Sequence, residues 1–225
     1  MSKITSFLTE LNHNNNREWF QNHKSEYEQA RKEFIDLVNA TIQAIGLFDA
    51  QVHGLQAKAS IFRLYRDVRF SKDKRPYKTH FGAYMAEGGR KSPKAGYYLH
   101  IEADGGFLGG GLFRPAPDAL KKVRMQIDYN AAQLRNILKE PTFVDTYGKM
   151  QGEQLKTSPR DFSADHPDID LLRYKDFFVS HPFHNSVLQN DAVAYFAKRF
   201  THLKPLNDYL NQAIAFDEEE PQVQF

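Results

Sequence analysis

The apolar positions of residues 2–46 recur at helical spacing. Residues 2–12 predict a short helix with Ser2 as its N-cap. From about 16–45, aromatic and aliphatic residues recur every three or four positions, which predicts one long helix that Asn16 caps and Gly46 ends. We expect this helix to pack an apolar stripe on one side of a sheet. The stripe contains Trp19, Tyr27, Phe34 and Val38.

The pattern then changes from helical to alternating. Residues 60–67, SIFRLYRD, place Phe62 and Leu64 on one side and Ile61 and Tyr65 on the other, which predicts a strand. Later runs predict three further strands, at 79–89, 96–104 and 106–115. Gly105-Gly106 separates the last two, so we expect a hairpin there. Consecutive strands indicate an antiparallel sheet.

The C-terminal half returns to helical spacing. A helix is expected from Pro117, with a kink at Tyr129-Asn130. Residues 141–176 are expected to be irregular, whereas 176–183 predict another strand.

Two amphipathic helices are expected over 191–214, separated near Pro205 because proline removes a helical hydrogen bond. The acidic tail, about 216–225, is expected to fray. The predicted fold class is α+β, with an antiparallel sheet of about four to five strands flanked by N-terminal and C-terminal helices. We expect one domain over 1–225, since this length suits a single sizeable core.

Composition places the chain among globular proteins, with 41% hydrophobic and 26% charged residues. It contains no cysteine, which excludes disulfides, thiolate metal ligands and cysteine nucleophiles and fits a cytoplasmic location. We see no signal peptide and no run near the roughly 18 apolar residues of a membrane span. We therefore expect no membrane partner.

Positive charge is concentrated in residues 63–78, RLYRDVRFSKDKRPYK, although the whole chain has a net charge of only +2. Seven cations and two acids give this segment +5 by subtraction, 7 − 2, with Tyr65, Phe70 and Tyr77 between them. The cations are Arg63, Arg66, Arg69, Lys72, Lys74, Arg75 and Lys78, and the acids are Asp67 and Asp73. Converging arginines repel one another unless an anion compensates them, so the segment is a candidate anion site.

The same segment resembles the hallmark of the DUF2461 family, bacterial and fungal proteins of unknown function. Its signature is similar to Arg-x-x-Arg-Asp-x-Arg-Phe followed, after a short gap, by Asp/Asn-Lys-x-x-Tyr. It falls on Arg63, Arg66, Asp67, Arg69, Phe70, Asp73, Lys74 and Tyr77. Segments 14–27, 97–115 and 166–179 are also similar to that family. The resemblance implies no activity, so the chemistry has to come from the residues.

Other candidate motifs are weaker. The glycines of DGGFLGGG, residues 104–111, do not lead into a helix as a phosphate-binding loop requires, and we interpret them as a hairpin with close backbone packing. The nine histidines form no H-x-x-x-H pair and no H-E-x-x-H motif, so we expect no metal and no cofactor. Asp73 and Glu102 are candidate general bases without a partner in the sequence pattern.

Three functions stay open. In the first, Arg63, Arg66 and Arg69 clamp a phosphorylated or carboxylated small molecule and Lys74 adds charge. Tyr77 would bind it too, and Tyr77 or Asp67 would move protons if the protein is an enzyme. In the second, the same cations contact nucleic-acid phosphates and the tyrosines stack on bases, although +2 is a low net charge for that class.

In the third, the motif only holds a loop in a structural or interaction protein. We also predict that Arg66 and Asp67 interact, directly or through a neighbour. The sequence assigns no oligomeric state.

Overall fold

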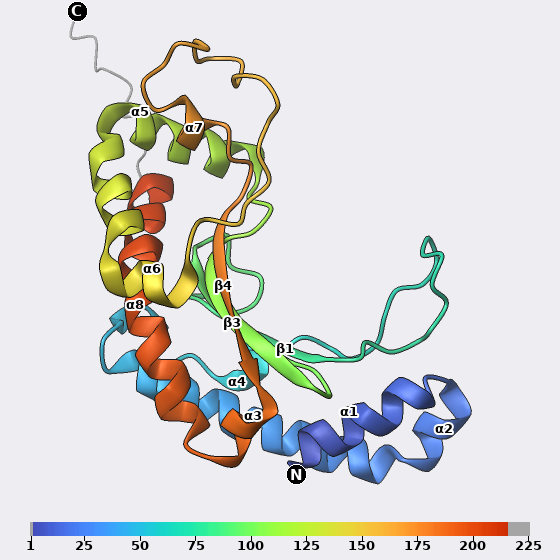
Figure 1. The fold of residues 1–225 in the computed structure, drawn as a ribbon. Coiled ribbons are helices and arrows are strands. Elements are labelled where there is room, and N and C mark those ends of the chain that lie inside the picture. The colour runs from blue at the N-terminus through green and yellow to red at the C-terminus, as the bar shows by residue number, and fades with distance from the viewer. Residues whose placement is uncertain (1, 216–225) are drawn as a thin grey trace, which may run out of the picture. The chain divides into compact units, whose positions relative to one another are not determined.

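The computed structural model describes residues 2–215 (Figure 1). The prediction of a frayed tail at 216–225 lies outside this range. The chain forms two compact units, described separately below. Among the described residues, the first contains 2–92, 96–109 and 180–202, and the second contains 93–95, 110–179 and 203–215. The expectation of a single domain stays a prediction.

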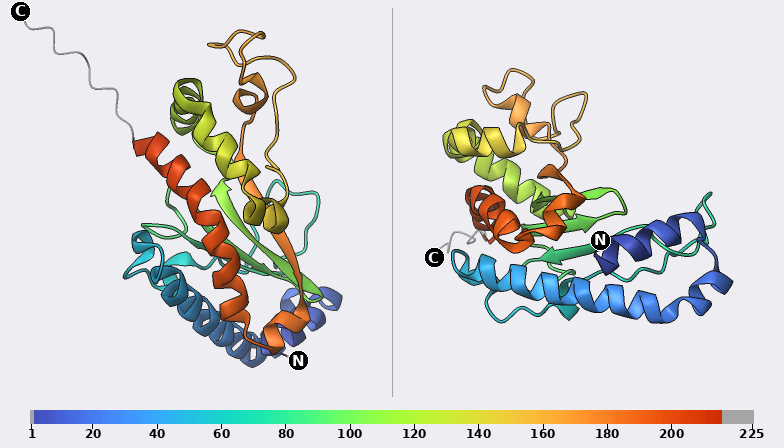
Figure 2. Two further views of the ribbon diagram at one scale, coloured as in Figure 1. Left: turned by 60° about the vertical axis from the view of Figure 1, so that its left-hand side comes forward. Right: turned by 60° about the horizontal axis from the view of Figure 1, so that its bottom comes forward.

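Three helices begin the first unit and lie together at one side of it (Figure 2). Helix α1 spans Lys3–His13, and the hydroxyl of its predicted N-cap Ser2 accepts a hydrogen bond from the Thr5 N–H. Helix α2 spans Arg17–Asn22, where Asn16 caps as predicted, and α3 spans Lys24–Gly46.

The prediction of one long helix over 16–45 is therefore wrong, because His23 adopts a non-helical backbone conformation between α2 and α3. Phe20 of α2 is buried against Phe7 of α1 and stacks on Tyr77. We attribute the break to this packing, which sets a direction for α2 that a straight helix would not follow.

Only the α3 part of the predicted apolar stripe faces the sheet, where Tyr27 and Phe34 contact Phe81 of the first strand. Phe34 and Val38 are fully buried, and the Phe34 ring lies 5.2 Å from the ring of Phe81. Tyr27 is half-buried and stacks on Phe81, whereas Trp19 stacks on His23. Short helical segments follow α3: the 3-10 turn Ala50–Val52 and α4, Ala57–Ser60.

The sheet has four antiparallel strands in the order β1-β2-β3-β4, within the predicted number. Their bounds are β1 Phe81–Met85, β2 Gly96–Ile101, β3 Gly105–Leu112 and β4 Phe177–His184. Strands β1 and β2 pair in a register that places Gly82 opposite His100. The fold is α+β.

Two predictions about strands need correction. Residues 60–67 form no regular strand, because only isolated bridges join Ile61 to Ala83 and Tyr65 to Tyr77. The chain leaves the sheet after Phe62 and pairs with its own later residues. Gly105 and Gly106 lie in β3 rather than in the turn. The strands approach so closely there that a side chain at 106 would collide with the His100 carbonyl oxygen.

The second unit contains the helices that lie between β3 and β4 along the chain. Helix α5, Pro117–Lys139, is interrupted at Asn130 as predicted. Residues 141–176, expected to be irregular, contain the short helices α6 and α7. These span Pro141–Tyr147 and Ile169–Leu172.

Helix α8, Ala192–Ala215, follows a second 3-10 turn at Asn185–Gln189 and runs on through Pro205. The predicted break there is wrong. Leu203, Leu206 and Leu210 are fully buried around the proline, and burial of this apolar face stabilises the helix despite the lost hydrogen bond. Within residues 2–215, none of the helices combines the length and apolar character needed to cross a bilayer.

Candidate functional site

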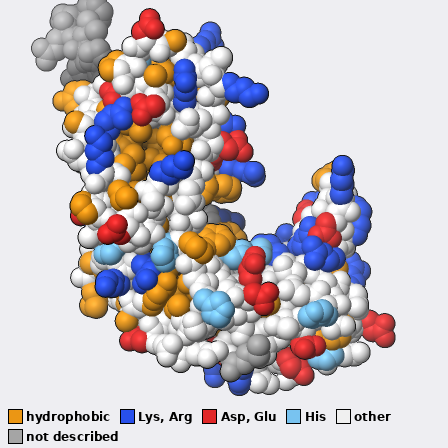
Figure 3. All heavy atoms as spheres, in the orientation of Figure 1, with side chains coloured by type: hydrophobic (Ala, Val, Ile, Leu, Met, Phe, Trp, Pro, Cys, Tyr) orange, Lys and Arg blue, Asp and Glu red, His pale blue; other side chains and the backbone are white. Residues whose placement is uncertain are grey.

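Residues 63–78 form an arm, which we call the basic arm (Figure 1). Its two limbs pair like a short ribbon. The Arg66 N–H donates to the Pro76 carbonyl at 2.9 Å, and the Lys78 N–H donates to the Leu64 carbonyl at 2.8 Å. Blue Lys and Arg side chains gather on the arm in Figure 3. The sequence pattern that predicted a strand therefore belongs to one limb of the arm.

Tyr77 anchors the arm to the helices. Its side chain is 3% exposed, and its ring stacks on Phe20 with centroids 4.1 Å apart. The Asn15 side chain accepts from the Tyr77 N–H at 3.1 Å and donates to the Tyr77 carbonyl at 3.0 Å. Burial raises the pKa of Tyr77. These contacts assign the predicted ligand-binding tyrosine a packing role.

Arg66 holds the tip of the arm together from inside. Its guanidinium donates to Asp73 at 2.7 Å, to the Arg75 carbonyl at 3.1 Å and to Ser71 at 3.3 Å. Arg75 donates to the same Asp73 carboxylate and, with help from Arg66, holds the pKa of Asp73 well below its usual range. Asp73 is therefore a shared anchor, which leaves it poorly suited to act as a general base.

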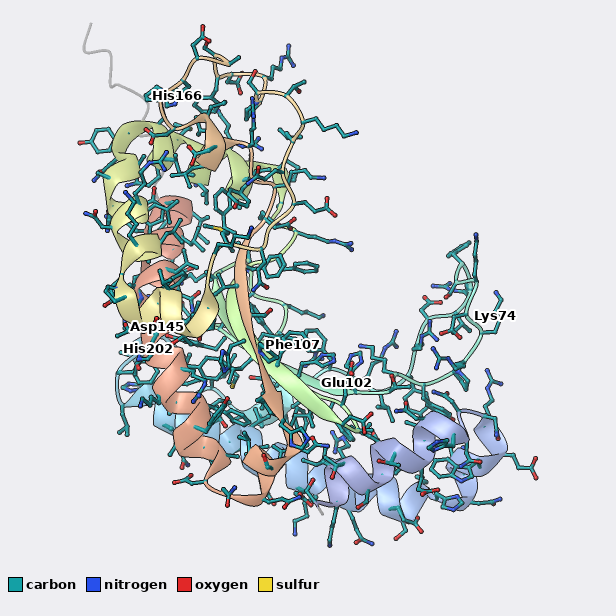
Figure 4. All side chains as sticks on the ribbon, in the orientation of Figure 1. Lys74, Glu102, Phe107, Asp145, His166 and His202 are labelled. Carbon is teal, nitrogen blue, oxygen red and sulfur yellow. The ribbon has the colours of Figure 1, made fainter. Side chains whose placement is uncertain are left out.

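The other acid of the arm binds Arg69. Two parallel hydrogen bonds, of 3.0 and 2.7 Å, join the Arg69 guanidinium to the Asp67 carboxylate and lower the pKa of Asp67. Arg66 and Asp67 thus have different partners, so the predicted interaction between them is wrong. Lys74, near the tip in Figure 4, donates to the Val68 carbonyl at 3.1 Å. Three predicted anion ligands, Arg66, Arg69 and Lys74, have partners inside the arm.

Two cations at the foot of the arm differ from the three arginines that pair with Asp67 and Asp73. Within residues 2–215, no carboxylate forms an ion pair with Arg63 or Lys78. Lys78 is half-buried with its ammonium 5.4 Å from the centre of the Phe62 ring. Burial lowers the pKa of Lys78, and the nearby charge of Arg63 lowers it further. Positive charge without an ion-pair partner therefore lies at the foot, where Lys78 is half-buried and the exposed Arg63 acts on the Asp67 carboxylate from a distance.

A hydrogen-bonded row of side chains covers the adjacent sheet face. Tyr98, His100 and Glu102 alternate along and just beyond β2, so they project to the same side. The Tyr98 hydroxyl lies 3.0 Å from His100 Nδ1, and His100 Nε2 lies 3.0 Å from Glu102 Oε1. Glu102 and Phe107 are labelled over this part of the sheet in Figure 4. Glu102 is a candidate general base for which the sequence pattern indicates no partner. In the structure its partner is His100.

His80 joins this row from the other strand. It directly precedes β1, and the register that pairs Gly82 with His100 continues to place His80 opposite Glu102. The ring of His100 stacks between those of His80 and Phe107, at 4.1 and 4.5 Å. The alternation of Tyr98, His100 and Glu102 is visible in the sequence and indicates a shared face. The proximity of His80 depends on the register of β1 and β2 and is not visible there.

Both histidines have a pKa below the ordinary value, which favours the neutral imidazole. Burial lowers the pKa of His80 to about 4, and His100 and Lys78 add to the shift while Glu102 opposes it. Burial also lowers the pKa of His100, against the effect of the Glu102 hydrogen bond. Burial raises the pKa of Tyr98 to about 12. Neutral imidazoles can accept or donate protons and can ligate metals.

These features define the class: an α+β protein whose antiparallel sheet has a basic arm and a histidine-carboxylate row at the arm's foot. The chain belongs to the DUF2461 family, described as a conserved hypothetical protein, whose model matches residues 3–209. The family that the sequence resembles is thereby confirmed. No curated protein and no solved structure matches the chain.

Proposed function

We propose that the protein binds a phosphorylated or carboxylated small molecule at the foot of the basic arm. One observation carries the proposal: Arg63 and Lys78 have no carboxylate partner within residues 2–215, and Lys78 is half-buried. A partly desolvated ammonium without a counter-charge is costly, and an anion from outside would compensate it. Neutral His80 and His100 add hydrogen-bonding groups there.

The other predicted ligands contribute less directly. Arg66, Arg69 and Lys74 keep the arm in shape and add to its positive potential, which attracts anions over a distance. If the protein also changes the bound molecule, the neutral histidines are better placed for proton transfer than Asp67 or Tyr77. Asp67 is occupied by Arg69, and Tyr77 is buried. The cytoplasmic location stays a prediction.

A second candidate, binding of single-stranded nucleic acid along the arm, has one specific observation in its favour. Phe70 near the tip is 97% exposed in a segment of net charge +5. Aromatic rings beside cations stack on bases, at about 1–3 kcal/mol per base. Under this alternative the tip of the arm, rather than its foot, carries the affinity.

Variants of the foot and the tip separate these functions. Arg63→Ala and Lys78→Met change the foot, and methionine keeps the apolar stem over Phe62. Lys72→Ala and Phe70→Ala change exposed residues of the tip. Calorimetric titration at low salt uses inorganic phosphate, a hexose phosphate, citrate and a short single-stranded oligodeoxynucleotide.

We expect a small anion to bind, and each foot variant to lose about 1.5–3 kcal/mol of binding free energy, the value of a hydrogen bond to a charged group. The tip variants should bind it normally. Binding of the oligonucleotide alone, weakened by the tip variants and steeply by salt, would establish the second candidate. If no probe binds, the arm has only a structural or interaction role.

A further inference from the structure

The row of side chains at the foot of the arm contains a cluster of a second chemical kind. His80, His100 and Glu102 each offer one ligand atom, and these atoms lie within 4.8 Å of one another. The sheet brings them together, because His80 precedes β1 while His100 and Glu102 lie on and just after β2. Two imidazoles and one carboxylate are a ligand set of catalytic zinc sites and of other divalent transition-metal centres.

We propose that His80, His100 and Glu102 bind a divalent transition-metal ion of the zinc type. The cluster shares His80 and His100 with the anion site proposed above, but metal binding does not require the anion. Three protein ligands leave at least one coordination position open, which is the arrangement of a catalytic rather than a structural metal site.

The distances between ligand atoms suit one metal. His100 Nε2 and Glu102 Oε1 are 3.0 Å apart, close to the roughly 3.3 Å between two ligands that each lie about 2.0–2.1 Å from a tetrahedral ion. The rings of His80 and His100 stack at an angle of 29°, so their in-plane lone pairs do not yet converge. Metal binding therefore requires the half-buried His80 ring to rotate.

Outer contacts hold His100 in a ligating orientation. If Nε2 binds the metal, Nδ1 carries the proton and donates to the Tyr98 oxygen, now 3.0 Å away. Such a second partner commonly fixes the tautomer and orientation of a ligating histidine. Gly82 leaves room for this contact, since a side-chain carbon there would lie 2.8 Å from the Tyr98 oxygen.

The charges near the cluster make a distinctive prediction. Lys78 influences both histidines electrostatically and opposes a dication, and Glu102 is the only carboxylate among the three ligands. Removing the charge in Lys78→Met should therefore tighten metal binding several-fold. The same variant should weaken binding of a small anion, an expectation that rests on the proposed function. General destabilisation of the protein would weaken both metal binding and anion binding, so an increase in one affinity and a decrease in the other would come from the lost charge.

The test is titration of the metal-free protein with Co²⁺, monitored by visible d–d absorption, followed by displacement with Zn²⁺. No anionic ligand is added. We expect one equivalent per chain, with affinity at least about 10-fold weaker in His80→Ala, His100→Ala and Glu102→Gln, and about 10-fold weaker in Tyr98→Phe. His13→Ala, which changes an exposed histidine on α1, is the matched control and should bind normally.

Absence of the absorption band, or equal affinity in the ligand variants and the control, would overturn the proposal. Glu102→Gln keeps the test decisive if a histidine variant fails to fold, because the Glu102 side chain is 57% exposed and its replacement should be tolerated. Metal binding without any anion binding would support this site and refute the proposed function. Anion binding without metal binding would support the proposed function and refute the metal site.

Discussion

The attachment of the basic arm to the helices depends on one amide side chain. Tyr65 and Tyr77 face each other across the arm, and the hydrogen bonds between its limbs come from the residues on either side. Tyr77 is therefore at a non-hydrogen-bonded position, where the N–H and carbonyl point away from the partner limb. Asn15 satisfies both groups, as a neighbouring strand would. Asn15→Ala removes both hydrogen bonds without changing the arm itself.

The expected cost follows from these two contacts. Each intramolecular hydrogen bond contributes about 0.5–1.5 kcal/mol, so their loss should destabilise the docked arm by about 1–3 kcal/mol. The upper half of this range applies if water does not reach the groups left behind, and Tyr77 is only 3% exposed. None of residues 65–76 is buried, so we expect the arm to open without unfolding of the rest of its unit and the effect to be local.

Amide hydrogen exchange of the Arg66 and Lys78 N–H groups measures this opening directly. In Asn15→Ala these amides should exchange about 5- to 160-fold faster, the ratio that corresponds to 1–3 kcal/mol. Asn14→Ala is the matched control, since its side chain makes an exposed hydrogen bond to the Glu10 carbonyl and does not contact the arm. Equal exchange in the two variants would refute the anchoring role of Asn15.

Three further predictions concern stability and charge. Phe34→Ala truncates a fully buried ring and should destabilise the protein by about 3–5 kcal/mol in chemical denaturation, whereas wild-type stability would show that the α3 stripe is not core. Asp67→Asn should leave the denaturation midpoint unchanged, because the pair with Arg69 is exposed; a clear decrease would restore a structural role for Asp67. The His80 ring should titrate with a pKa of about 4 in NMR. Since this pKa is depressed below the unfolded value near 6.5, stability should fall as pH decreases through that window; a midpoint near 6.5 would contradict the burial of His80.

The excess charge of the arm has two explanations in the structure. Asp67 and Asp73 between them hold Arg66, Arg69 and Arg75, so much of the motif serves the shape of the arm. The cations left over at its foot are Arg63 and Lys78. The sequence does not distinguish the three arginines of the motif, because spacing does not reveal which carboxylate each one reaches.

The sequence alone determined the elements whose signals are local. The Ser2 and Asn16 caps, the kink at Asn130 and the four strands all follow from residues within a few positions of one another. Helix periodicity, caps and strand alternation depend on residues close together in the chain, so they can be recognised in a single sequence. The family motif at 63–78 was visible in the same way.

The tertiary structure decided what depends on distant residues. The burial of Phe20 ends α2 at His23, and the burial of leucines carries α8 through Pro205, both against the local signal. The register of β1 and β2 brings His80 to His100 and Glu102, which are 20 and 22 positions further along the chain. Packing and strand register are properties of pairs of segments, and the free energy of burial can outweigh local propensity by several kcal/mol. The residue pattern within one segment therefore does not predict which other segment it contacts.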